Sequence, residues 1–114
     1  MYKNFSNKRR ELKKKDRIAI LERDGLLCRR CGITLKLISI EKRVSVEGGI
    51  FHHIVPQIYG GENSYNNACL VCVSCHNKIH SGDEDKNKYF KMYEEYIKTG
   101  FLEGELWEEK KEKI

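Results

Sequence analysis

The 114-residue sequence contains no apolar run approaching the roughly 20 residues that a membrane-spanning helix needs. It also shows no leader with a charged start, an apolar middle and a small-residue cleavage site, because residues 1–16 are polar and basic. Its aliphatic side chains are spread thinly among many lysines and glutamates. These absences predict a cytoplasmic protein with no membrane contact and only a small hydrophobic core.

Cysteine is plentiful by contrast, and a core of this size commonly needs a metal or disulfides for additional stability. Without a secretory leader, a disulfide framework has little support. Four of the five cysteines form two Cys-x-x-Cys pairs, Cys28/Cys31 and Cys72/Cys75, the arrangement of a closed tetrahedral zinc site. The sequence therefore predicts a structural Zn²⁺ bound by these four thiolates. The fifth cysteine, Cys69, lies in an apolar stretch and is expected to be a small buried side chain.

All four histidines lie within 29 residues. His76 and His80 are four residues apart, so on a helix they share one face and can bind a single ion. His52, on a preceding strand, can complete a three-ligand set with an open position, as catalytic ions have. Because neighbouring strand residues point to opposite faces, His53 would stay off the ion and could take a proton from water. The alternatives are that one or two histidines only pack, or that His76 replaces a cysteine in the zinc site.

Positive charge is concentrated at the N-terminus. Residues 1–17 carry eight basic and two acidic side chains, net +6, whereas the whole chain has a net charge of +5. A basic arm on a nearly neutral body is typical of proteins that contact a nucleic-acid backbone, although a solvated terminus has the same composition. The candidate contact residues, in the arm and beyond it, are Lys8, Arg9, Arg10, Lys13, Lys14, Arg43 and Lys78.

The order of the expected elements predicts an α+β fold without repeats or linkers. Residues 1–114 are expected to form one domain with a basic N-terminal helix (1–24), a zinc-stapled core (25–82) and a C-terminal helix and tail (83–114). The individual predictions are helices over about 8–23 and 85–98, short strands over 35–40, 44–46 and 50–55, a loop over 57–67, and the entry to a ligand-bearing helix over 67–80.

The histidines and the second cysteine pair are parts of one longer motif: His52-His53-Ile-Val-Pro56, Gly60-Gly61, Asn67, Cys72-x-x-Cys75-His76 and His80. This motif resembles the HNH endonuclease family with its ββα-metal fold, over about half of the chain. The His-His pair and the His-x-x-x-His helix look most like the colicin-type variant, whereas many relatives have Asp in place of His52. The paired cysteines are similar to those of zinc-stapled HNH proteins of phages and mobile elements.

The resemblance implies a metal-dependent endonuclease that hydrolyses DNA, expected to be double-stranded. It implies that His52, His76 and His80 bind the catalytic ion and that His53 is the general base. It also implies that Asn67 holds the loop that orients His53. The ion itself is left open among Zn²⁺, Ni²⁺, Mn²⁺ and Mg²⁺. A second copy of the chain and a phage packaging protein are open as partners.

Two other functions are compatible with the same residues. The main alternative is a zinc-stabilised DNA-binding or adaptor module without catalysis, in which the histidines form a second structural site. The third is an RNA-directed nuclease or toxin built on the same site. For a nuclease with a histidine base, activity is expected to rise as the pH passes through about 6 to 7.

Overall fold

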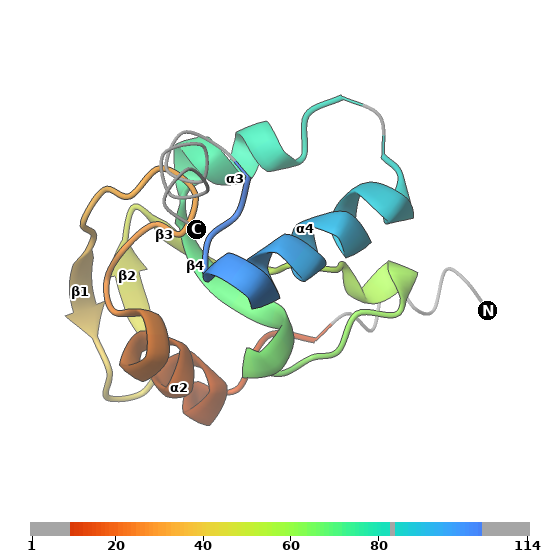
Figure 1. The fold of residues 1–114 in the computed structure, drawn as a ribbon. Helices are drawn as coiled ribbons and strands as arrows, with labels where there is room; N and C mark the ends of the chain where they lie inside the picture. Colours follow the sequence, from red (N-terminus) through yellow and green to blue (C-terminus); the bar gives the residue numbers. More distant parts are fainter. Residues whose placement is uncertain (1–9, 83, 104–114) are drawn as a thin grey trace.

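The computed structural model describes residues 10–82 and 84–103. These residues form an α+β fold with two antiparallel two-stranded sheets, β1–β2 and β3–β4 (Figure 1). None of the helices in this part of the chain has the length and apolarity needed to cross a bilayer. In chain order the elements are α2 (Lys14–Asp24), β1 (Lys36–Ser39), β2 (Ser45–Glu47), β3 (Gly49–His53), the 3-10 turns η1 (Gln57–Tyr59) and η2 (Tyr65–Asn67), β4 (Ala68–Cys72), α3 (Val73–Ile79) and α4 (Lys86–Thr99).

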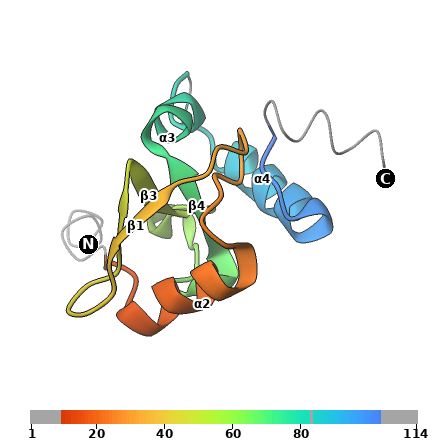
Figure 2. The ribbon, with the colours of Figure 1, turned by 90° about the vertical axis from the view of Figure 1, so that its left-hand side faces the viewer.

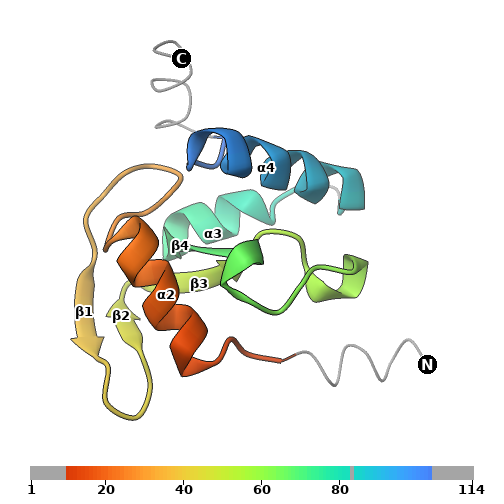
Figure 3. The ribbon, with the colours of Figure 1, turned by 60° about the horizontal axis from the view of Figure 1, so that its bottom comes forward.

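The β3–β4 hairpin and α3 form the ββα unit that the sequence predicted. In its register His52 pairs with Cys69, and His53 pairs with Ala68. The strand β4 runs directly into α3, because Cys72 is both the last residue of β4 and the N-cap of α3. The hairpin lies between α2 on one side and α3 on the other (Figures 1 and 2). The last helix, α4, runs beside α3 (Figure 3).

The expectation of a helical entry from residue 67 is wrong for residues 68–72, which form β4. All five side chains of this strand are buried. A strand covered on both faces has no alternation of polar and apolar residues. The spacing of residues in such a short apolar run therefore does not distinguish a strand from a buried helix. The helix that carries His76 begins only at Val73.

Helix α2 also differs from the prediction of a helix over about 8–23, because it begins at Lys14 within the described residues. Residues 10–13 are non-helical, and Leu12 enters the core with 5% of its surface exposed. Arg17 stabilises this bend, since its Nε donates to the Leu12 carbonyl at 3.2 Å. The proposed contact residues Lys8 and Arg9 lie outside the described residues.

The core joins all the helices to the central hairpin. Ile20 of α2, Leu70 of β4 and Tyr89 of α4 are fully buried. Arg23 fastens α2 to the segment entering β4, because its guanidinium donates to the carbonyls of Tyr65 at 2.8 Å and Ala68 at 2.7 Å. The hairpin that carries His52 and His53 therefore contacts helices on both of its sides.

Candidate active site and metal centres

The four paired cysteines meet at one point. Among the described residues, Cys28, Cys31, Cys72 and Cys75 place their sulfur atoms within 4.8 Å of one another. The Cys31 and Cys72 sulfurs are 3.9 Å apart, close to the roughly 3.8 Å edge of a tetrahedron with Zn–S bonds of about 2.3 Å. The cluster is compatible with a structural zinc site.

The surroundings of Cys28 favour the thiolate that a zinc ligand requires. Burial alone would raise the pKa of Cys28, but backbone N–H groups of Cys31, Cys72 and Arg30 outweigh it and bring the pKa to about 7. One of these donors, the Cys72 amide, lies 3.3 Å from the Cys28 sulfur. Cys75 differs, since burial raises its pKa, although Arg30 Nη1 donates to its sulfur at 3.5 Å. Four sulfur atoms this close together, with the pKa of Cys28 lowered, fit Zn²⁺.

The loop that carries Cys28 and Cys31 is also hydrogen-bonded to β4 and to the segment after α4. The Arg29 amide donates to the Leu70 carbonyl at 2.9 Å, and the Arg29 carbonyl accepts from Leu102 at 2.8 Å. The Arg29 guanidinium donates to the Gly100 carbonyl at 2.9 Å. The cysteine cluster thereby connects β4 with the end of α4.

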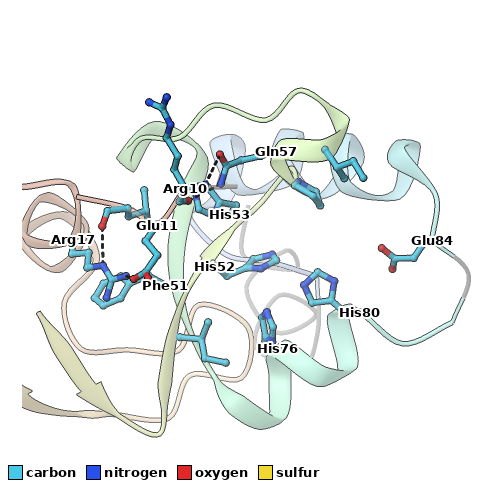
Figure 4. A pocket seen from close by; sticks show the side chains of 14 residues that line it. Arg10, Glu11, Arg17, Phe51, His52, His53, Gln57, His76, His80 and Glu84 are labelled. Atoms are coloured by element: carbon cyan, nitrogen blue, oxygen red, sulfur yellow. Dashed lines mark hydrogen bonds and ion pairs between the residues drawn. The ribbon is translucent and has the colours of Figure 1, made fainter. Parts of the chain in front are cut away.

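The three predicted histidine ligands converge from β3 and α3 (Figure 4). His52, His76 and His80 each place a ring nitrogen within 4.8 Å of the others. The ring centroids of His76 and His80 are 4.5 Å apart, and that of His52 lies 5.6 and 5.4 Å from them. Because Cys75 and His76 are consecutive residues of α3, the cysteine and histidine clusters are built on the same short helix.

His52 is the most buried of these ligands, with 2% of its surface exposed. Its Nε2 is buried and has no hydrogen-bond partner, which is a costly arrangement for a polar atom unless an ion binds there. Burial, followed by the neighbouring His80 and His76, lowers the pKa of His52 well below 6.5. A neutral imidazole with an unsatisfied nitrogen is the form that binds a divalent ion, so the three residues fit such an ion.

His53 lies next to this cluster and contributes no nitrogen to it. Its Nε2 is 2.8 Å from Oδ1 of Asn63, while Nδ2 of Asn63 donates to the Glu11 carbonyl at 3.5 Å. An amide oxygen only accepts hydrogen bonds. Neutral His53 therefore carries its proton on Nε2, and Nδ1 is the nitrogen that can accept one. No sequence pattern distinguishes Asn63, which is one of several asparagines in a polar loop.

Asn67 ties together the loop between β3 and β4. Its buried side chain accepts from the Val55 amide at 3.0 Å and donates to the carbonyls of Val55 and Glu62, both at 2.9 Å. A Cβ at Gly61 would lie 1.8 Å from the Val55 carbonyl oxygen, so only glycine fits there. Asn67 thus fixes the backbone two residues after His53, whereas the hydrogen bond to the His53 ring comes from Asn63.

Comparison with known proteins agrees with this geometry. A family model described as HNH endonuclease matches residues 28–82. These residues belong to the HNH endonuclease family. The resemblance drawn from the motif is confirmed, and nuclease-type activity and nucleic-acid binding are general properties of HNH domains. No curated protein and no solved structure matches the chain.

Residues outside the HNH domain also reach the histidine cluster. Nδ1 of His80 lies 2.9 Å from the Tyr89 hydroxyl, which donates to Oε2 of Glu84 at 2.7 Å. Burial, and then Glu84, raise the pKa of Tyr89, so that its hydroxyl stays protonated. The spacing of apolar residues in α4 indicates only that Tyr89 packs in the core, because a hydroxyl that points toward a histidine leaves no trace in a hydrophobic pattern.

A cleft of about 500 Å³ opens over the histidines of the HNH domain. Its other side is formed by the segment before α2, where the Gln57 side chain donates to the Arg10 carbonyl at 2.8 Å and accepts from the Arg10 amide at 3.4 Å (Figure 4). The residues that line it include Arg10, Glu11, Arg17, Phe51, His52, His53, Gln57, His76, His80 and Glu84. The N-terminal segment therefore borders the same cavity as the HNH histidines.

Of the other predicted nucleic-acid contacts, Lys14 and Arg43 line a second hollow of about 230 Å³. Lys13 and Lys78 are exposed, and Lys78 lies on α3 with His76. Lys14 donates to the Glu41 carbonyl, and Arg43 forms an ion pair with Glu11. Of the predicted basic residues, only Arg10 lines the cleft of the HNH domain in the described part of the chain.

Proposed function

We propose that this protein is a metal-dependent endonuclease that hydrolyses phosphodiester bonds in duplex DNA. The observation that supports this most strongly is the convergence of His52, His76 and His80 around a buried nitrogen without a protein partner. His53 adjoins that cluster and has its Nε2 occupied by Asn63. A ligand set and an uncoordinated base in one cleft are what phosphodiester hydrolysis requires.

The chain's own residues would divide the reaction as follows. His53 would take a proton from water at Nδ1, while Asn63 keeps the other ring nitrogen protonated. Asn67 and Gly61 would hold the loop so that the ring does not shift relative to the cleft. A divalent cation on the three histidines would supply positive charge for the phosphate and the leaving oxygen.

The position of the N-terminal segment supports a polyanionic substrate. Arg10 lines the cleft, and three further basic residues, Lys3, Lys8 and Arg9, precede it in the chain. A duplex that enters the cleft would therefore meet positive charge next to the scissile bond. Four reduced thiolates suit a reducing compartment, so we also propose that the protein acts in the cytoplasm.

A plasmid-nicking assay tests this function. Supercoiled plasmid incubated with the protein and a divalent ion should be converted to nicked or linear forms, and chelator should stop the conversion. Replacing His53 by Ala should lower the rate by roughly 10²-fold or more, the usual contribution of a general base. DNA affinity and zinc content should stay unchanged in this variant, because His53 belongs to neither metal cluster.

Each competing function gives a different result in the same assay. A binding module would shift the plasmid on a gel but leave it supercoiled. A ribonuclease would cleave single-stranded RNA faster than duplex DNA. An undiminished rate after the His53→Ala substitution would remove His53 from its assigned role.

A further inference from the structure

A chain of two hydrogen bonds leads from the histidine cluster to α4. Nδ1 of His80 and the hydroxyl of Tyr89 are 2.9 Å apart, and the hydroxyl is 2.7 Å from a carboxylate oxygen of Glu84. The Tyr89 side chain is fully buried and stacks on Tyr59 of η1, with ring centroids 5.9 Å apart. The hydroxyl of Tyr89 is therefore held in place by the burial of its side chain on α4 and by the contact with Tyr59 in the HNH domain.

The direction of these bonds follows from the available protons. A carboxylate only accepts, so the single hydroxyl proton of Tyr89 goes to Glu84. The Tyr89 oxygen must then accept from His80, which requires the proton of neutral His80 to be on Nδ1. Because an imidazole has two nitrogens, Nε2 of His80 is the one with a lone pair for an ion.

We propose that Tyr89, oriented by Glu84, is a positioning residue that fixes the tautomer and ring orientation of His80 for metal binding. The inference rests on the metal site of the proposed function. Metal-binding histidines generally donate the N–H of their second ring nitrogen to an oxygen acceptor, and loss of that acceptor typically lowers metal affinity 10- to 100-fold. Glu84 and Tyr89 lie beyond residues 28–82, so this chain adds them to the HNH domain from outside it.

The chain also offers a matched control on the same helix. Tyr96 of α4 is buried, and its hydroxyl donates to a carboxylate oxygen of Asp24 at 2.5 Å. Tyr89→Phe and Tyr96→Phe thus each remove one hydroxyl that donates to a carboxylate. Only Tyr89 contacts a histidine of the cluster. General destabilisation of α4 should affect both variants, whereas loss of positioning should affect one.

The experiment is a titration of the full-length, zinc-loaded protein with Ni²⁺, an ion that imidazole binds well, by isothermal calorimetry. We expect Tyr89→Phe to weaken Ni²⁺ binding about 10- to 100-fold and Tyr96→Phe to leave it within about twofold. Glu84→Ala should also weaken binding, because Tyr89 could then donate to His80 and favour the wrong tautomer. Nitrogen-15 NMR of the His80 ring, before Ni²⁺ is added, should show the Nδ1–H tautomer in the wild type and loss of this preference in Tyr89→Phe.

The two ways of failing are separable. If the wild type and a His52→Ala variant bind Ni²⁺ equally, the metal site and the proposed function both fail. If the wild type binds through His52 while Tyr89→Phe matches it in affinity and in the His80 tautomer, only the positioning role is overturned. Equal losses in Tyr89→Phe and Tyr96→Phe with an unchanged tautomer would likewise overturn it.

Discussion

Oδ1 of Asn63 lies 2.8 Å from Nε2 of His53, and this contact decides which nitrogen of neutral His53 carries the proton. Replacing Asn63 by Ala should therefore lower cleavage about five- to tenfold, since a neutral hydrogen bond contributes about 1 kcal/mol. Asn63→Asp keeps the acceptor and should retain most of the rate. Single-turnover cleavage of a DNA duplex measures both effects.

The neighbouring Asn66 provides the control for this loop. Asn66 is exposed, and its backbone amide rather than its side chain bonds to Ser64. Asn66→Ala should leave the rate unchanged. A loss as large as that of Asn63→Ala would indicate a general sensitivity of the loop and contradict the assignment.

The Gly61 backbone passes so close to Val55 that any side chain would collide with its carbonyl. Gly61→Ala should lower the free energy of unfolding by at least the roughly 1–3 kcal/mol typical of overpacking, and should displace the loop that follows His53. Gly25→Ala is the comparison for backbone strain alone, because Gly25 has a positive φ of 72° and no atoms within 4 Å of its missing Cβ, whereas Gly61 has the close contact without a positive φ. Urea unfolding of both variants measures the difference, and equal losses would contradict a steric role for Gly61.

Two cysteines of the same strand should behave differently. Cys72 belongs to the cluster of four cysteines. Cys69 of β4 is fully buried in the core and is not part of that cluster. Cys72→Ala should abolish stoichiometric zinc binding and leave the domain unstable, since a structural zinc contributes directly to folding. Cys69→Ala should keep one zinc per chain and lose only packing energy. Metal analysis with thermal unfolding checks this, and retained zinc in Cys72→Ala would contradict the ligand assignment.

The lowered pKa of His52 predicts a pH dependence of stability. Burial is the main cause, so the folded chain resists protonation of His52 while the unfolded chain takes up a proton near pH 6.5. Without an ion on the histidines, this contribution is complete above that pH and is lost as the pH falls below it, by up to about 1.4 kcal/mol per pH unit. Urea unfolding between about pH 5 and 8 measures this slope. His52→Gln should flatten it, and an equally steep slope in that variant would assign the effect to another group.

The basic arm should act mainly on affinity. Leu12 is buried and Arg10 is tied to Gln57, so a deletion that probes the arm has to end at residue 9. Removing residues 1–9 should reduce the salt dependence of DNA binding by about 0.9 per lost phosphate contact. Replacing Lys3, Lys8 and Arg9 by Gln should do the same without shortening the chain. An unaltered salt slope in both proteins would mean that the arm is only solvated.

The grouping of the four cysteines and of the three histidines could be predicted from the sequence, because metal coordination depends on residue type and spacing. The Cys-x-x-Cys pairs and the His76/His80 spacing need little more than a turn or a helix to bring their side chains together. The hairpin register then supplies His52. These parts of the fold and the site are determined locally or by pairs of short elements.

The supporting hydrogen bonds could not be predicted in the same way. The partners Asn63 and Tyr89 are 10 and 9 residues from the histidines that they contact. Both connections cross irregular loops, where backbone geometry and not periodicity decides which side chains meet. The start of α2 was misplaced for a related reason, since burial of Leu12 overrode a helix-compatible sequence.

The succession of Cys75 and His76 on α3 has a consequence for regulation. A single turn of helix, begun at the Cys72 N-cap, presents a thiol to one cluster and an imidazole to the other. Oxidants or alkylating reagents that react with the cysteine sulfurs would therefore displace the histidine side chains without reacting with them. Under the proposed function, strand scission would then depend on the redox state of sulfur atoms that take no part in the reaction.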